Sequence, residues 1–113
     1  MLKKKFLPAF HGLKDAWEHP AVRIQIILGC MAVIAGLILR LSLIEWAFVL
    51  FAVGLVIGAE VFNTCIEKLC DLHSMEFDHR IEVIKDMSAG GVLIAAITAL
   101  AIAILILIRH LGI

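Results

Sequence analysis

The chain has 113 residues, of which 63% are hydrophobic, and its mean hydropathy is +1.07. Soluble domains are about half apolar, so this composition excludes an ordinary soluble domain and indicates a membrane protein. The formal net charge is zero, which by itself says nothing about nucleic acids. The membrane composition nevertheless argues against a nucleic acid as a partner.

The first segment, about residues 6–20, has a helical repeat of apolar side chains. These recur at three- and four-residue spacing and are Phe6, Leu7, Phe10, Leu13, Ala16 and Trp17. Lys14, Asp15 and Glu18 lie between them, so the pattern predicts an amphipathic helix in the membrane surface. A disordered tether is the alternative. Because Pro8, Pro20 and the charges interrupt this segment, no signal peptide is expected.

Three later segments are long and apolar enough to cross a bilayer, which takes about 20 residues. They cover about residues 24–44, 46–66 and 87–108. No repeat or long linker divides the chain, so residues 1–113 are expected to form one domain. The predicted fold is an all-α membrane protein with an N-terminal surface helix and three transmembrane helices.

The basic residues predict how the chain is oriented. With three spans, the N-terminus and the segment between the second and third spans lie on one side, which holds eight Lys and Arg residues against two on the other. The eight are Lys3, Lys4, Lys5, Lys14, Arg23, Lys68, Arg80 and Lys85, and the two are Arg40 and Arg109. The positive-inside rule therefore predicts a cytoplasmic N-terminus.

Polar side chains follow the apolar run of the second span, at Glu60, Asn63, Glu67 and Asp71. Their offsets of 3, 7 and 11 residues from Glu60 place them in one stripe along a helix, at about 100° per residue. A charged side chain near the centre of a bilayer costs roughly 2.5–3.5 kcal/mol on insertion scales. The stripe is therefore expected to face protein, water or a bound cation, and it is the candidate functional site.

Such a stripe has three possible roles. Carboxylates could hold Mg²⁺ together with substrate phosphates. The deepest of them, Glu60, could be a general base, because carboxylates that are removed from water accept a proton more readily. They could instead conduct ions. Lys85 and Asp86, returning at the base of the third span, would add a phosphate-binding charge and another carboxylate.

A cation, a lysine and a deep base together favour phosphoryl transfer to an acceptor dissolved in the bilayer. A small oligomeric channel or carrier and a purely structural stripe are the alternatives. Against transport, the second span is apolar from Trp46 to Val53, and the third offers only Thr98 at mid-depth. The polarity thus stops halfway across. No Walker loop or kinase-type glycine loop is present, so a nucleotide would have to be held by other means.

The residues also resemble a known family. The second span ends in Glu60-Val-Phe-Asn63-Thr-Cys-Ile-Glu67-Lys-Leu-Cys-Asp71, and Lys85-Asp86-Met-Ser-Ala-Gly begins fourteen residues after Asp71. This two-part motif resembles that of the prokaryotic diacylglycerol kinases and undecaprenol kinases, Glu-x-x-Asn-[Ser/Thr]-Ala-Ile-Glu-x-x-x-Asp and then Lys-Asp-x-x-[Ala/Ser]-[Ala/Gly]. The segment 10–17 and Arg23-Ile-Gln25 resemble the surface helix and first span of that family, so the resemblance covers nearly the whole chain.

The resemblance implies a homotrimeric lipid kinase of the bacterial inner membrane, with ATP as co-substrate and active sites shared between subunits at the cytoplasmic boundary. It implies the following roles: Glu60 as the base for the lipid hydroxyl, Glu67 as a ligand of Mg²⁺ and ATP, Asn63 and Asp71 as supporting residues, and Glu76, Lys85 and Asp86 as ATP contacts. The Asn-Thr pair and the Ala-Gly-Gly after Asp86 favour undecaprenol slightly over diacylglycerol as the acceptor.

The chain departs from the family pattern at one position. Members usually carry a second metal-binding glutamate four residues before the arginine matched here by Arg23, and this chain has His19 there, with Glu18 beside it. Glu18 is the predicted ligand because Mg²⁺ prefers carboxylate oxygen. The alternatives are that His19 replaces the glutamate or that the second ligand is lost.

Overall fold

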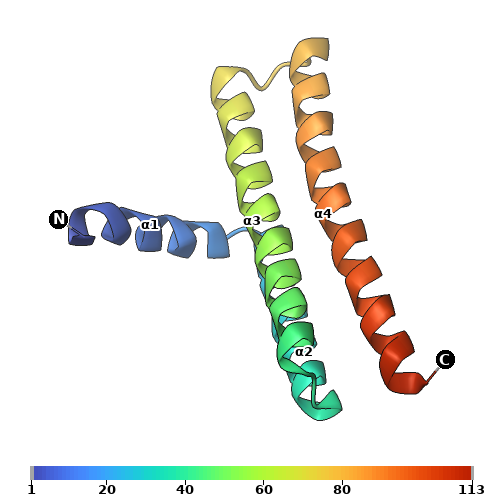
Figure 1. Ribbon diagram of the computed structural model, residues 1–113. Coiled ribbons are helices and arrows are strands. Elements are labelled where there is room, and N and C mark those ends of the chain that lie inside the picture. The colour runs from blue at the N-terminus through green and yellow to red at the C-terminus, as the bar shows by residue number, and fades with distance from the viewer. Residues whose placement is uncertain (1, 113) are drawn as a thin grey trace.

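The computed structural model describes residues 2–112, with side chains from residue 4 onward. Met1, Ile113 and the side chain of Lys3, which counts toward the predicted orientation, lie outside the described residues. Four helices follow one another along the chain: α1 (Leu2–Trp17), α2 (Pro20–Leu39), α3 (Leu43–His73) and α4 (His79–Leu111) (Figure 1).

Helices α2, α3 and α4 are each long and apolar enough to cross a membrane, and the predicted all-α membrane fold is confirmed. They lie side by side, while α1 projects sideways from them at about the middle of the length of α3 (Figure 1). α3 has 31 residues, a length of about 46 Å. Since the hydrocarbon core is ~30 Å thick, part of α3 must extend beyond it.

The first long helix ends at Leu39, earlier than the predicted limit at residue 44. Arg40 takes a left-handed conformation (φ 55°), and its N–H bonds to the carbonyls of Gly36 and Leu37. This closes the end of α2 in the way a C-cap does. α3 then begins with a capping box, in which the Ser42 hydroxyl accepts from the Glu45 N–H and the Glu45 carboxylate accepts from the Ser42 N–H.

Small residues bring α2 against α3. The buried residues of α2 are Val22, Gly29 and Gly36, spaced seven apart on one face of the helix. A Cβ at Gly29 would lie 2.9 Å from Cγ1 of Val53, and one at Gly36 would lie 2.8 Å from the Trp46 ring. Membrane helices approach closely at such positions, so these two glycines set the spacing of α2 and α3.

α3 and α4 make the most extensive helix contact, and they run antiparallel on either side of the connection 74–78. Asp78 caps α4: its carboxylate accepts from the Arg80 N–H at 2.9 Å and pairs with the Arg80 guanidinium at 3.0 Å. The hydrogen bond from the Arg80 side chain, followed by that from its N–H, holds the pKa of Asp78 below its ordinary value. α4 thus begins at His79, two turns before the predicted span.

Few apolar side chains are covered within one chain. The buried apolar residues are Ala16, Val22, Ala52, Val56, Cys70 and Ala95, whereas large side chains such as Leu43, Ile38 and Phe62 are more than 70% exposed. Exposed aliphatic surface on this scale is typical of helices that face lipid or other membrane helices. The interior of the chain is the narrow seam along α3.

Candidate active site

Burial divides the stripe on α3 into two halves. Glu60 and Asn63 are only 7% and 8% exposed, and Thr64 beside them is also buried. Glu67 and Asp71, nearer the end of the helix, are exposed. The stripe therefore runs from a covered carboxylate at Glu60 to a solvent-accessible one at Asp71.

Hydrogen bonds within α3 orient the middle of the stripe. Nδ2 of Asn63 donates to Oε1 of Glu67 at 3.2 Å, and the Thr64 hydroxyl donates to the Glu60 carbonyl at 3.0 Å. Oδ1 of Asn63 is buried and finds no hydrogen-bond partner among the described residues. An unpaired buried acceptor costs about 1–3 kcal/mol, so this oxygen is suited to accept a hydrogen bond from a ligand or water.

Lys85 connects α4 to the far end of the stripe. Its Nζ lies 2.8 Å from Oδ1 of Asp71, and both side chains are partly exposed. An exposed ion pair contributes about 0–1 kcal/mol, so this contact is weak enough to be exchanged for another anion. The spacing of the two motifs brought both residues into consideration, but their direct pairing was not predicted.

A hollow of about 230 Å³ lies between the 74–78 connection and the adjoining helix ends. It is called the loop pocket here, and its charged lining residues are Asp71, Glu76, Asp78, Glu82, Lys85 and Asp86. Four of the predicted site residues, Asp71, Glu76, Lys85 and Asp86, thus meet at one place. Carboxylates outnumber the lysine five to one, so an anionic nucleotide would need cations to bind there.

The predicted second metal ligand lies in the short turn between α1 and α2. Glu18 is exposed, and His19 is the N-cap of α2 without a side-chain capping bond. In the described part of the chain, no three His, Cys, Asp or Glu side chains gather closely enough to hold a metal ion. A single chain therefore offers the exposed Glu67 carboxylate, which accepts from Nδ2 of Asn63, as a hard oxygen donor. One carboxylate fits Mg²⁺, which commonly uses one or two carboxylates plus substrate phosphates.

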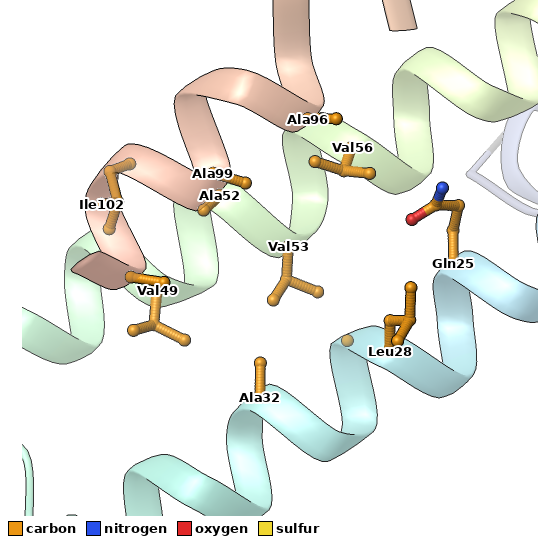
Figure 2. Close-up of a pocket in the computed structure, with 12 residues that line it drawn as sticks. Gln25, Leu28, Ala32, Val49, Ala52, Val53, Val56, Ala96, Ala99 and Ile102 are labelled. Carbon is orange, nitrogen blue, oxygen red and sulfur yellow. The ribbon is translucent and has the colours of Figure 1, made fainter. Parts of the chain in front are cut away.

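A second hollow, of about 320 Å³, lies deeper in the helix bundle (Figure 2). It is called the apolar groove here, and α2, α3 and α4 all line it. Its walls are mostly Ala, Val and Leu side chains, with Gln25 of α2 contributing an amide. Val56 lines the groove and Glu60 stands one helical turn further along the same face, so the groove extends toward the covered carboxylate.

Sequence reasoning missed one buried carboxylate. Glu45, only 5% exposed, lies at the opposite end of α3 from the stripe, where its oxygens lie 3.0 and 3.1 Å from Nε2 of His110. The Ser42-x-x-Glu45 spacing of a capping box was the available signal for its helix-start role. No local pattern indicates His110, which is 65 residues away.

Three helices long and apolar enough to cross a membrane, with a polar site toward one end, define this protein's class as a small integral-membrane protein. The family model of the prokaryotic diacylglycerol kinases matches residues 8–107. The chain belongs to the prokaryotic diacylglycerol kinase family.

Curated relatives agree with this assignment. The chain is 27% identical to an undecaprenol kinase of Bacillus subtilis, over 97% of this chain and 93% of that protein. It is 31% identical to a diacylglycerol kinase of Helicobacter pylori, over 84% of this chain and 77% of that protein. It is 30% identical to a diacylglycerol kinase of Escherichia coli, over 92% and 86% of the two chains. The chain is thus a membrane lipid kinase that uses ATP and a lipid substrate.

Proposed function

We propose that this kinase transfers the γ-phosphoryl group of ATP to the hydroxyl of a lipid alcohol at the cytoplasmic face of the bacterial inner membrane, with undecaprenol favoured over diacylglycerol. The observation that supports this proposal is the polar stripe on α3. Within two helical turns it holds a covered carboxylate, a buried Asn63 oxygen without a hydrogen-bond partner in the described part of the chain, and an exposed carboxylate. Lys85 of α4 contacts the Asp71 end of the stripe.

Glu60 is the proposed general base. Its burial beside the apolar groove keeps bulk water from competing with a lipid hydroxyl, and the groove offers space for the hydrocarbon of the acceptor. The Glu60 carboxylate takes the hydroxyl proton while the lipid oxygen attacks the γ-phosphorus. The bond from that phosphorus to the β–γ bridging oxygen breaks, and ADP leaves with the electron pair.

The loop pocket is the proposed nucleotide site. Lys85 would exchange Asp71 for phosphate oxygens, while Glu76 and Asp86 would face the rest of the nucleotide. Glu67 would hold Mg²⁺, with Glu18 as the second carboxylate ligand. The metal would neutralise phosphate charge in a pocket that is otherwise acidic.

A homotrimer with shared sites is the proposed assembly. Two observations support more than one chain per site: no complete metal-binding cluster forms in the described part of one chain, and Ala95 is the only buried residue recorded for the 33-residue α4. Neighbouring copies would supply the missing ligand and cover the helix. The excess of basic residues on one side supports a cytoplasmic N-terminus.

The choice of acceptor rests on few residues, namely Asn63-Thr64 and Ala89-Gly90-Gly91. The named relatives include kinases of both kinds. A direct assay separates them: the purified protein in detergent, with labelled ATP and Mg²⁺, is given each lipid alcohol in turn. Undecaprenol is expected to be phosphorylated with the higher kcat/KM. Preference for diacylglycerol would overturn the acceptor, and phosphorylation of neither would overturn the function.

The same assay tests the second metal ligand. Glu18→Gln is expected to raise the Mg²⁺ concentration needed for half-maximal rate by roughly tenfold or more, whereas His19→Gln should leave it unchanged. The reverse result would assign the role to His19. No change in either variant would mean that the N-terminal turn supplies no ligand.

A further inference from the structure

At the end of the α3–α4 pair that is opposite the stripe, where α3 begins and α4 ends, there is a polar contact that the proposed chemistry does not use. Glu45 of α3 is buried, and Nε2 of His110 in α4 lies 3.0 Å from its Oε2 and 3.1 Å from its Oε1. A carboxylate only accepts, so Nε2 carries the hydrogen. Nη1 of Arg109 lies 4.0 Å from Oε1, and Arg109 is the only Lys or Arg that the described residues bring that close to Glu45.

Among the described residues, a carboxylate of α3 pairs with side chains of α4 at two places: Glu45 with His110 and Arg109, and Asp71 with Lys85. The separations between these two places nearly match on the two helices. Asp71 follows Glu45 by 26 residues on α3, and His110 follows Lys85 by 25 residues on α4. At 1.5 Å per residue these separations are about 39 and 38 Å. Two antiparallel helices with matched distances between their contact points can satisfy both pairs in only one axial register.

The surface between the two pairs does little to specify that register. Its buried polar residues Asn63 and Thr64 donate their side-chain hydrogen bonds within α3 rather than to α4. Ala52, Val56 and Ala95 are buried there and are small or apolar. Side chains of this kind allow helices to approach closely but discriminate weakly between neighbouring registers, whereas polar contacts between membrane helices are specific. The Asp71–Lys85 pair cannot hold the register by itself if Lys85 is to release Asp71 for a nucleotide.

We propose that Glu45 and His110 are positioning residues: their contact fixes the axial register of α4 against α3, and so the depth at which Lys85 and Asp86 face the stripe. This inference rests on the proposed function, since it assigns Lys85 to the nucleotide. Glu45 has a separate role as a helix cap with Ser42. His110 takes no part in that cap, so a change at His110 tests the register contact alone.

The test compares His110→Ala with His110→Lys, which keeps a side-chain N–H donor, and with Ser42→Ala, which weakens the cap but leaves the contact between helices. In the lipid-kinase assay, His110→Ala is expected to raise KM for ATP roughly five- to tenfold, the size of effect expected from losing one ordinary hydrogen bond, with a smaller change in kcat. His110→Lys should recover most of the wild-type KM. Ser42→Ala should leave KM unchanged.

A second measurement follows the register directly. Spin labels at positions 69 and 82, near the cytoplasmic ends of α3 and α4, are introduced into a cysteine-free chain that is diluted with unlabelled chain. The distance distribution is expected to be narrow in the wild type and in His110→Lys, and shifted or broadened in His110→Ala. His110→Gln, a milder change that keeps a donor, should fall between them and replaces His110→Ala if that variant does not fold.

Unchanged KM or unchanged distances in His110→Ala would overturn the proposal, as would an equal rise in KM in Ser42→Ala. If the wild type phosphorylates no lipid, the proposed function fails. The spin-label distances then still report whether Glu45 and His110 hold the register.

Discussion

The two ends of the α3–α4 pair differ in whether their buried polar groups have hydrogen-bond partners. At one end, both Glu45 oxygens have partners, from Ser42 and His110. At the other, Oδ1 of Asn63 is buried without a partner among the described residues, and Lys85 is held only by an exposed carboxylate. Since an unpaired buried polar atom costs about 1–3 kcal/mol, the first end is a completed structural contact, whereas the second is prepared for a ligand.

Of the substitutions that test this comparison, Glu60→Gln is expected to have the largest effect, a loss of lipid phosphorylation. Removing a general base lowers rates by roughly 10²–10⁴-fold, and the amide should preserve the fold because it has nearly the same shape. Lipid phosphorylation is measured at saturating ATP, with the exposed carboxylate variant Asp15→Asn as the control. Full activity in Glu60→Gln would show that Glu60 is not the general base.

Asn63→Ala tests whether the unpaired oxygen and the bond to Glu67 matter together. The substitution removes the donor that orients the Glu67 carboxylate and the buried acceptor, so activity should fall roughly 10–100-fold, as for other residues that orient metal ligands. The Mg²⁺ concentration needed for half-maximal rate should rise as well. A rate loss without any change in Mg²⁺ dependence would contradict the assigned partnership of Asn63 and Glu67.

Ser42→Ala probes the completed end. Loss of an N-cap side chain costs about 1 kcal/mol, so thermal unfolding in detergent should occur at a slightly lower temperature while kcat remains near the wild-type value. Gly54→Ala, at a position of α3 with no heavy atom within 4 Å of the added Cβ, is the control for a small change in a helix. A large loss of kcat in Ser42→Ala would mean that the two ends are not separable.

The smallest expected effect is a local one, the loss of the Asp78 helix cap on acidification. The pKa of Asp78 is lowered by its hydrogen bonds from Arg80, so the cap is fully formed above the ordinary aspartate value of about 3.9 and is lost as the pH falls through the lowered value. The Arg80 amide signal, followed by NMR in micelles, should therefore titrate with a midpoint below the ordinary value. Asp78→Asn should abolish that transition. A titration midpoint above the ordinary aspartate pKa in the unmodified protein would contradict the prediction.

The family resemblance and the helical phase of the stripe led to the same residues by different routes. Glu60, Asn63, Glu67 and Asp71 could be placed on one face from their spacing alone, because a helix repeats every 3.6 residues. The roles drawn from the resemblance for Glu18, Glu60 and Glu67 stay predictions. The end of α2 was less predictable, since Arg40 adopts a left-handed conformation that glycine or asparagine would ordinarily signal.

The sequence by itself determined the class of the protein, its helices, the stripe and its family, because hydropathy, helical period and motif spacing are local properties of the chain. Only the tertiary structure decided which residues meet across helices. It paired Lys85 with Asp71 and Glu45 with His110, and it gathered Glu76 and Asp86 into the loop pocket. Contacts of this kind depend on how two long helices are aligned along each other, and the local sequence pattern of either helix does not record that alignment.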